Sequence, residues 1–260
     1  MSSSVVSQVF PEPLECTVRS FDATTIAFDI YDKPGRSIVL VIPGFWRNRR
    51  HPAMQRFAAF LNTEGYAAAV CDLRGHGDSE GTFGFNLSEH YDIAAVCEEL
   101  LRRRSWESIT LVGLSYGGAI AISTAARHEL PLASLLLVSP VSQAASISPR
   151  INLFTMHRHV AIGQALSTPR FNWRRLRNPL NVRAIDDVCN VHAPICLVHV
   201  KDDWLIDHSN SVALYERANE PRELHIIDIA GNYHADRIFN IAADRVDPII
   251  TTFLDRYTPK

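Results

Sequence analysis

The chain has 260 residues, 47% of them hydrophobic and 21% charged, which is a composition typical of globular proteins. Its 26 Lys and Arg nearly balance its 28 Asp and Glu, so the formal net charge of -2 argues against a general affinity for nucleic acid. No apolar run approaches the roughly 18 residues that span a bilayer, and the first residues do not resemble a signal peptide. With five cysteines and no CxxC pair, the sequence predicts reduced thiols in a cytoplasmic protein.

The first predicted elements are short β-strands. Residues 14–19 and 25–31 are rich in β-branched and aromatic side chains and flank a short turn, so they predict a hairpin. Residues 37–42 (SIVLVI) form a continuous apolar run without polar alternation. Such a run predicts a strand that is buried on both faces of a parallel sheet.

Helical and strand patterns alternate after residue 50. Apolar residues at helical spacing predict helices at 51–64, 88–104 (with Ser88 as N-cap), 116–128, 207–218 (starting at Asp207 or Ser209) and 242–257. Apolar runs predict strands at 66–71, 109–112, 135–138, 195–200 and 224–229. Buried strands that are separated by helices predict an α/β fold with a doubly wound, mostly parallel sheet.

Residues 141–184 interrupt this alternation with three prolines and mixed helical patches. A segment of about 40 residues is too long for a connection between a helix and a strand, where 2–6 residues are usual. We therefore expect a small cap over one end of the sheet. The cap is inserted into a single domain that spans residues 1–260.

The sharpest motif is GLSYG at residues 113–117, which lies between a predicted strand and an Ala-rich helix. This strand–turn–helix context is the one that a nucleophile elbow needs. On so tight a turn, side chains at Gly113 and Gly117 would collide with neighbouring backbone. The turn would expose the hydroxyl of Ser115 at a helix N-terminus, where developing negative charge is stabilised.

At these residues the chain resembles the α/β-hydrolase family, and the resemblance extends from about residue 13 to 257. In that family the nucleophile precedes the acid, and the acid precedes the histidine. His234 is the only one of eleven histidines that comes just after the last predicted strand. Loops at the carboxyl ends of strands carry the site in open α/β folds, so His234 is the expected base.

The acid is expected in the segment HVKDDWLI at residues 199–206, which follows a predicted strand. It is similar to the family's HGxxDxxV segment, with Val200 in place of the glycine. Aligning the histidines makes Asp203 the acid, while Asp202 and then Asp207 are the alternatives. The predicted triad is therefore Ser115, Asp203 and His234.

The resemblance also implies an oxyanion hole and a glycine turn. The donors of the oxyanion hole would be the backbone N–H groups of Phe45 and Tyr116, although Pro-Gly stands at 43–44 where the family usually has His-Gly. Residues 72–81 (DLRGHGDSEG) look like the family's DxRGxGxS segment. That segment is either a loop beside the substrate or, as we favour, a tight turn fixed by Asp72 and Arg74. These motifs are most similar to esterases of the cinnamoyl/feruloyl type and to monoacylglycerol-lipase-like relatives.

Substrate contacts are expected from the oxyanion loop and the cap, with Trp46, Arg47, Phe171 and Trp173 as candidates. Arginines gather in both places: Arg47, Arg49 and Arg50 in the loop, and Arg170, Arg174, Arg175, Arg177 and Arg183 in the cap. They could attract an anionic substrate or simply form a solvated surface, which is the interpretation that the balanced net charge favours.

Together, these features predict a serine hydrolase that cleaves a carboxylic ester or thioester through an acyl-enzyme, with no metal or cofactor. Alternatives on the same residues are amide, lactone or carbon–carbon bond hydrolysis. A protein of a different class, a non-catalytic binder of small molecules, would keep the pocket without the chemistry. The sequence leaves the substrate and the oligomeric state open.

Overall fold

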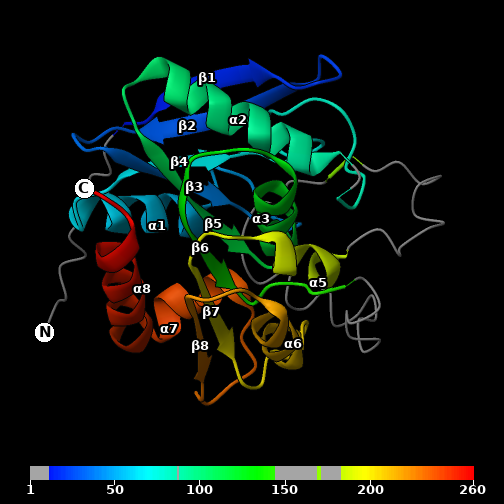
Figure 1. Ribbon diagram of the computed structural model, residues 1–260, viewed down its shortest axis with the longest axis vertical. Helices are drawn as coiled ribbons and strands as arrows, with labels where there is room; N and C mark the ends of the chain where they lie inside the picture. The colour runs from blue at the N-terminus through cyan, green and yellow to red at the C-terminus, as the bar shows by residue number, and fades with distance from the viewer. Residues whose placement is uncertain (1–11, 87, 144–168, 171–182) are drawn as a thin grey trace, which may run out of the picture.

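The computed structural model describes residues 12–86, 88–143, 169–170 and 183–260. In this part of the chain eight strands form one sheet, in the order β1-β2-β4-β3-β5-β6-β7-β8, and their labels run in that order from top to bottom of Figure 1. The strands are β1 (Leu14–Arg19), β2 (Thr25–Tyr31), β3 (Ser37–Ile42), β4 (Ala67–Cys71), β5 (Ser108–Leu114), β6 (Leu132–Val138), β7 (Ile195–Val200) and β8 (Arg222–Ile227).

Strand directions confirm the predicted hairpin and the mostly parallel sheet. β1 and β2 pair antiparallel, with Leu14 opposite Ile30, and β2 also runs antiparallel to β4. In sheet order, the six strands β4, β3, β5, β6, β7 and β8 run parallel to one another. As predicted for residues 37–42, every residue of β3 is buried. The fold is therefore of the α/β class, with a doubly wound sheet.

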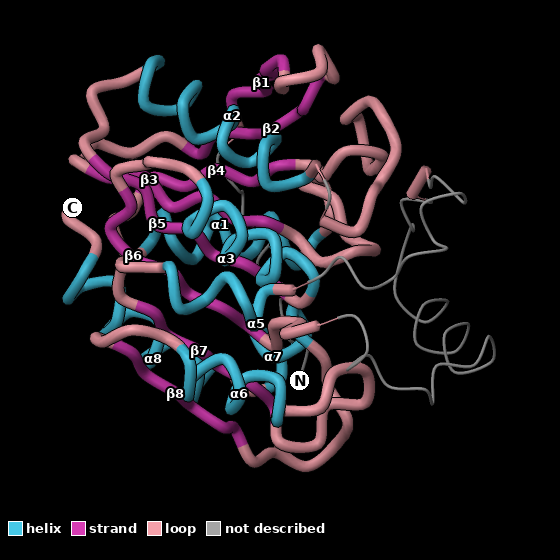
Figure 2. Tube along the Cα trace, turned by 45° about the vertical axis from the view of Figure 1, so that its right-hand side comes forward, coloured by secondary structure: helices cyan, strands magenta, loops and turns pink. Residues whose placement is uncertain are grey.

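Helices cover both faces of this sheet. The longer ones are α1 (Pro52–Thr63), α2 (Glu89–Arg103), α3 (Tyr116–Arg127), α6 (Ser209–Arg217) and α8 (Ala243–Tyr257). Side chains that alternate along β3 show the two layers: Leu40 packs in the core with α2, α3 and α6, and Val41 packs with α1 and α8. In Figure 2, α2, α3 and α6 pass in front of the strands. The carboxyl ends of the parallel strands carry the loops that are described below.

The predicted helices lie within two residues of those observed. Short turns such as α5 (Ala184–Asp187) and α7 (Ile238–Ile241) were not predicted. Ser88 does precede α2, but its side chain makes no capping hydrogen bond. Its backbone N–H instead donates to the carboxylate of Glu89, at 3.2 Å.

Two further expectations concern the predicted cap and membrane-spanning helices. Most of the predicted cap, residues 141–184, lies outside the described residues, as do Phe171 and Trp173. In the part of the chain that is described, no helix is both long and apolar enough to cross a bilayer.

A pair of histidines joins α2 to the end of α3. His90 Nδ1 lies 2.9 Å from His128 Nε2, and His90 is 4% exposed. Burial, reinforced by the nearby charges of Arg127 and His128, lowers the pKa of His90 from 6.5 to about 4. The folded state therefore disfavours the charged form. The stability that neutral His90 contributes is complete above about pH 6.5 and is lost as the pH falls toward about 4.

We therefore expect His90→Gln to flatten the pH dependence of the free energy of unfolding across this range. The slope should fall by up to about 1.4 kcal/mol per pH unit, because one group fewer takes up a proton on unfolding. Urea unfolding, followed by circular dichroism at a series of pH values, measures the slope. His192→Gln, at an exposed histidine, is the control, and a wild-type slope in His90→Gln would contradict the expectation.

Candidate active site

Four loops meet at the carboxyl edge of the parallel strands. Gly44 follows β3, Ser115 follows β5, Asp203 follows β7 and His234 follows β8. Because parallel strands end at the same edge, residues that are far apart in sequence come together there. The three residues of the predicted triad are brought together in this way.

Ser115 lies on the sharp turn that was predicted between β5 and α3. Its φ of 54° is a left-handed value, which is strained for a residue with a side chain. A β-carbon at Gly113 would lie 2.5 Å from the Cα of Gly118, and one at Gly117 would overlap the carbonyl oxygen of Ile42. Only glycine fits at these two positions, as the sequence predicted.

A continuous hydrogen-bond chain links the three side chains. The Ser115 hydroxyl lies 2.7 Å from His234 Nε2, and His234 Nδ1 lies 2.7 Å from Asp203 Oδ2. With the proton on Nδ1, His234 donates to the carboxylate, and its Nε2 lone pair is free to accept the hydroxyl proton. The side chain of Asp203 is 0% exposed and that of His234 is 12% exposed, so the pair is shielded from water. This arrangement can increase the nucleophilicity of a serine.

The Asp203 carboxylate is held ionised in this buried position. Its Oδ1 accepts the backbone N–H groups of Leu205 and Ile206, at 2.9 and 3.1 Å. Burial alone would raise the pKa of Asp203, but the imidazoles of His234 and His199 outweigh it and lower that pKa below its ordinary value. His199 is fully buried and hydrogen-bonds to the Ile206 carbonyl at 3.0 Å, in a structural position.

The two alternative acids lie elsewhere. Asp202 is exposed, and the Oδ1 of Asp207 accepts the N–H of Ser209 at the start of α6, at 2.9 Å. Of the three carboxylates, it is that of Asp203 that hydrogen-bonds to His234. The geometry therefore selects Asp203 among the three candidates.

The loop after β3 packs against Ser115. A β-carbon added to Gly44 would lie 3.2 Å from the Ser115 β-carbon, so the backbone of this loop approaches the elbow closely. Phe45 follows Gly44, and Tyr116 is the first residue of α3. Gly44, which precedes Phe45, thus lies close to Ser115, and Tyr116 follows Ser115 directly, so the backbone N–H groups of Phe45 and Tyr116 stay the predicted donors of an oxyanion hole.

His76 is a residue whose contribution the sequence did not reveal. It is 1% exposed, and its Nε2 hydrogen-bonds to the carbonyl oxygen of Phe45. Its ring also packs edge-on against Phe45, with centroids 5.5 Å apart. Burial lowers the pKa of His76, so the neutral ring is favoured. His76 therefore anchors the loop after β3 to the glycine turn.

The glycine turn at 72–81 has the structural role that we favoured. Asp72 accepts the backbone N–H of Arg49 at 2.7 Å and pairs with its guanidinium at 2.6 Å. A β-carbon at Gly77 would overlap the Asp72 carboxylate. Arg74 is 5% exposed and pairs with Asp92 at 2.6 Å. These residues fix the turn from within.

A cavity of about 220 Å³ opens beside Ser115 and His234. Its walls include the predicted Trp46 and Arg47. The residues that the sequence did not single out come from the loops after β6, β7 and β8 and from the segment around Phe85. They are Phe85, Val141, Trp204, Leu205, Ile206, Ala235, Asp236 and Arg237. Most of these side chains are apolar, so the cavity suits an uncharged group.

Each arginine of the loop after β3 has a carboxylate partner. Arg47 Nε lies 3.2 Å from both oxygens of Asp236, in the cavity wall. Arg49 is 3% exposed and pairs with Asp72, and the exposed Arg50 lies 3.0 Å from Asp78. These contacts compensate the positive charge of the loop. The cap arginines, apart from residues 170 and 183, lie outside the described residues.

A family model for serine aminopeptidases of group S33 matches residues 33–185, which is more than half of the chain. The chain belongs to this S33 family of α/β-hydrolases. The match covers the loop after β3, the glycine turn and the elbow at Ser115. It ends before Asp203 and His234, so their assignment rests on the geometry. The narrower similarity to cinnamoyl/feruloyl esterases and monoacylglycerol-lipase-like proteins stays a prediction.

Solved structures and curated proteins are also similar to this chain. An esterase from Pyrococcus furiosus has a similar fold, with a TM-score of 0.75 and 18% identity, covering 95% of this chain and 91% of the esterase. An α/β hydrolase from Penicillium sp. sh18 has a TM-score of 0.79 and 17% identity, covering 95% and 99%. Ethanol acetyltransferase 1 of Eremothecium cymbalariae is 25% identical over 188 residues, or 66% of this chain. The chain spans less than half of the length of the curated relatives that it matches, 42% and 48%.

Proposed function

We propose that this S33 family member is a serine hydrolase that cleaves a carboxylic ester or thioester through an acyl-enzyme. The observation that carries the proposal is the chain of two 2.7 Å hydrogen bonds from Ser115 through His234 to Asp203. Ser115 Oγ attacks the carbonyl carbon while His234 Nε2 takes its proton. His234 then returns the proton to the leaving group, and Asp203 stabilises the imidazolium in between. Water attacks the acyl-enzyme in the second half of the reaction.

The negative charge on the tetrahedral intermediate would be held by backbone donors. The N–H groups of Phe45 and Tyr116 are assigned this role, and removal of one such donor typically costs roughly 3–4 kcal/mol of transition-state stabilisation. The contact of His76 with the Phe45 carbonyl keeps the loop close to Ser115. With these donors, the proposed reaction needs no metal or cofactor.

One relative indicates a second possible acyl acceptor besides water. The match to an ethanol acetyltransferase suggests that an alcohol could replace water in attacking the acyl-enzyme. The mostly apolar walls of the cavity favour such an acceptor, because they can contact the alkyl chain of an alcohol. Transfer to alcohol uses the same residues as hydrolysis and differs only in the second half-reaction.

The substrate is expected to be uncharged next to the scissile bond. Arg47 would otherwise attract anions, but its paired contact with Asp236 cancels its charge at the cavity wall. The two side chains are only 22% and 10% exposed, so solvent screens the pair weakly. The Arg47–Asp236 pair therefore adds no net charge to the cavity wall, which favours a neutral acyl group.

Replacing Asp236, the acidic partner of Arg47, should change the preference between neutral and anionic substrates. In Asp236→Asn the charge of Arg47 is uncompensated, so kcat/KM for an ester whose acyl chain ends in a carboxylate should rise about tenfold relative to a neutral ester of equal length. A tenfold change corresponds to about 1.4 kcal/mol, a moderate Coulomb attraction for a partly buried charge. Kinetics on the two aryl esters at low and high salt measure the ratio.

The matched control is the double variant Arg47→Gln/Asp236→Asn, which removes both charges. It should return the ratio to the wild-type value and abolish its salt dependence. An unchanged ratio in Asp236→Asn would show that the pair does not select the substrate.

The proposed reaction is tested by a panel of aryl esters of graded acyl length, one aryl thioester and one anilide, each assayed with and without ethanol. Turnover of the esters or the thioester, and much slower turnover of the anilide, is the expected result. Ethyl ester formed in the presence of ethanol would identify the transferase reaction. Cleavage of the anilide alone would favour an amidase, and binding without turnover of any compound would favour the non-catalytic alternative.

A further inference from the structure

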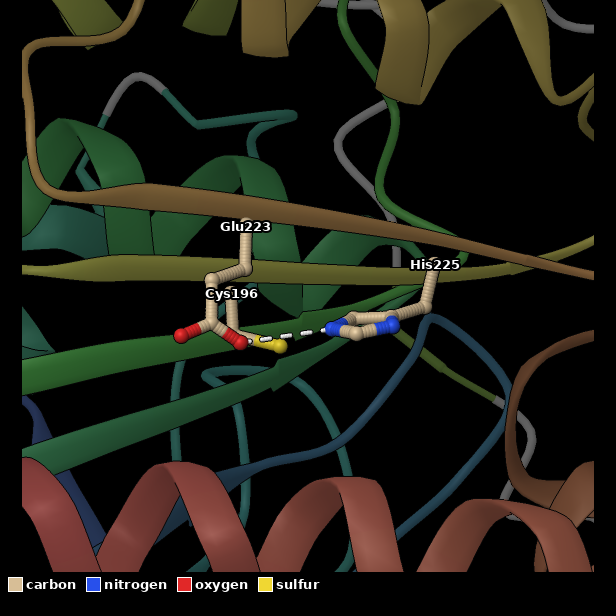
Figure 3. A group of neighbouring side chains, drawn as sticks. All are labelled: Cys196, Glu223 and His225. Atoms are coloured by element: carbon tan, nitrogen blue, oxygen red, sulfur yellow. Dashed lines mark hydrogen bonds and ion pairs between the residues drawn. The ribbon is translucent and has the colours of Figure 1, made fainter.

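A second group of reactive side chains lies on strands β7 and β8. Among the residues that the structure describes, Cys196, Glu223 and His225 each place one ligand atom within 4.8 Å of the others. Figure 3 shows the Cys196 sulfur beside the same Glu223 carboxylate oxygen that contacts His225. None of the three takes part in the proposed hydrolysis.

The strand register brings these side chains together. Cys196 is the partner of Glu223 across β7 and β8, and His225 follows two residues later along β8. Cross-strand partners, and residues two apart on one strand, point to the same face of a sheet, so all three lie on one face. Cys196 is the second residue of β7, whereas Asp203 follows the carboxyl end of that strand. The cluster is therefore at the opposite end of the sheet from Ser115.

From this arrangement we propose that Cys196, Glu223 and His225 bind one zinc ion. Thiolate, imidazole and carboxylate are the ligand types that zinc takes in proteins, and three protein ligands leave a fourth position for water. Two ligands bonded at about 2.0 Å in a tetrahedron are about 3.3 Å apart. The distance from Glu223 Oε2 to His225 Nε2 is 3.3 Å, so these two atoms already have the spacing of zinc ligands.

The surroundings provide both access and orientation. The side chains of Glu223 and His225 are 25% and 34% exposed, whereas Cys196 is fully buried. A cation from solvent would thus meet Glu223 and His225 first. Arg256 donates to Glu223 Oε1 at 2.5 Å, which turns Oε2 toward His225, as outer-shell partners of metal ligands do.

Binding would exchange a proton for the ion. Cysteine binds zinc as the thiolate, so a thiol ligand must lose its proton when the ion binds. Coordination forms the zinc–sulfur bond and releases the thiol proton to solvent. Affinity should therefore rise with pH.

Cobalt(II) and zinc(II) titrations of the full chain test the site. We expect one cobalt per chain, a thiolate-to-cobalt charge-transfer absorption, its loss when zinc is added, and a higher Tm with zinc. Cys196→Ala should abolish the absorption. His225→Gln should weaken cobalt binding by more than about 100-fold, since loss of even an outer-shell partner weakens binding by about 10–100-fold.

His225→Gln makes the test independent of core packing. His225 is partly exposed on the edge strand β8, whereas Cys196 is buried in the core. Cys189→Ser and His192→Gln, at an exposed thiol and an exposed imidazole, are the matched controls and should keep the absorption. The proposal is overturned if wild-type protein shows no such absorption, or if the absorption persists at full strength in both site variants.

Discussion

Ser115→Ala is expected to lower kcat for ester hydrolysis by roughly 10⁴- to 10⁶-fold. The alanine removes the only atom that can form the acyl-enzyme, while His234 and Asp203 remain hydrogen-bonded to each other at 2.7 Å. The fold should be unaffected, because Ser115 is held in its strained turn by Gly113 and Gly117 and not by its hydroxyl. Steady-state kinetics on the best aryl ester of the panel, with circular dichroism to verify folding, measure the loss.

Ser209→Ala, at an exposed serine on α6, is the control and should keep wild-type kinetics. Residual activity in Ser115→Ala that stays within tenfold of the wild type would contradict the assignment of the nucleophile. Such activity would indicate that another residue acts as a general base and activates water to attack the ester directly.

Asp203→Asn is expected to lower kcat by about 10⁴-fold through the tautomer of His234. The amide oxygen would take the place of Oδ1, because that atom accepts the N–H groups of Leu205 and Ile206. The NH₂ group then faces His234 Nδ1, which must act as an acceptor. The proton moves to Nε2, and Nε2 can no longer take the proton of Ser115. Kinetics on the same ester measure the effect.

Asp202→Asn is the matched control for this variant. Asp202 precedes Asp203 and is exposed, so its amide should leave kcat within about twofold of the wild type, as for most surface substitutions. If Asp202→Asn lowers kcat as strongly as Asp203→Asn, the acid has been assigned to the wrong carboxylate.

Much of the fold could be predicted because its signals are local. The apolar run at 37–42 is buried on both faces as expected, and β7 matches its predicted bounds. The short helices α5 and α7 could not be found, since four residues do not complete two helical turns and leave no periodicity. Strand order in the sheet is set by packing between distant segments, and no local pattern contains it.

In the candidate site, too, some residues could be predicted from local signals and others could not. Ser115 and His234 could be chosen by position, because an elbow and a loop after the last strand are visible in the sequence. The role of His76 could not, since its contact with the Phe45 carbonyl joins two loops that fold separately. Counts of arginine likewise do not show pairing, so the contact between Arg47 and Asp236, 189 positions apart, appeared only in the structure.

The central claim is that His234 activates Ser115 as a nucleophile, and a fluorophosphonate probe tests it most directly. The account predicts one adduct per folded chain, located on Ser115 by peptide mass spectrometry. The adduct should be absent in Ser115→Ala and should form far more slowly in His234→Ala. Failure of folded wild-type protein to react, or equal labelling of the wild type and Ser115→Ala, would contradict the claim.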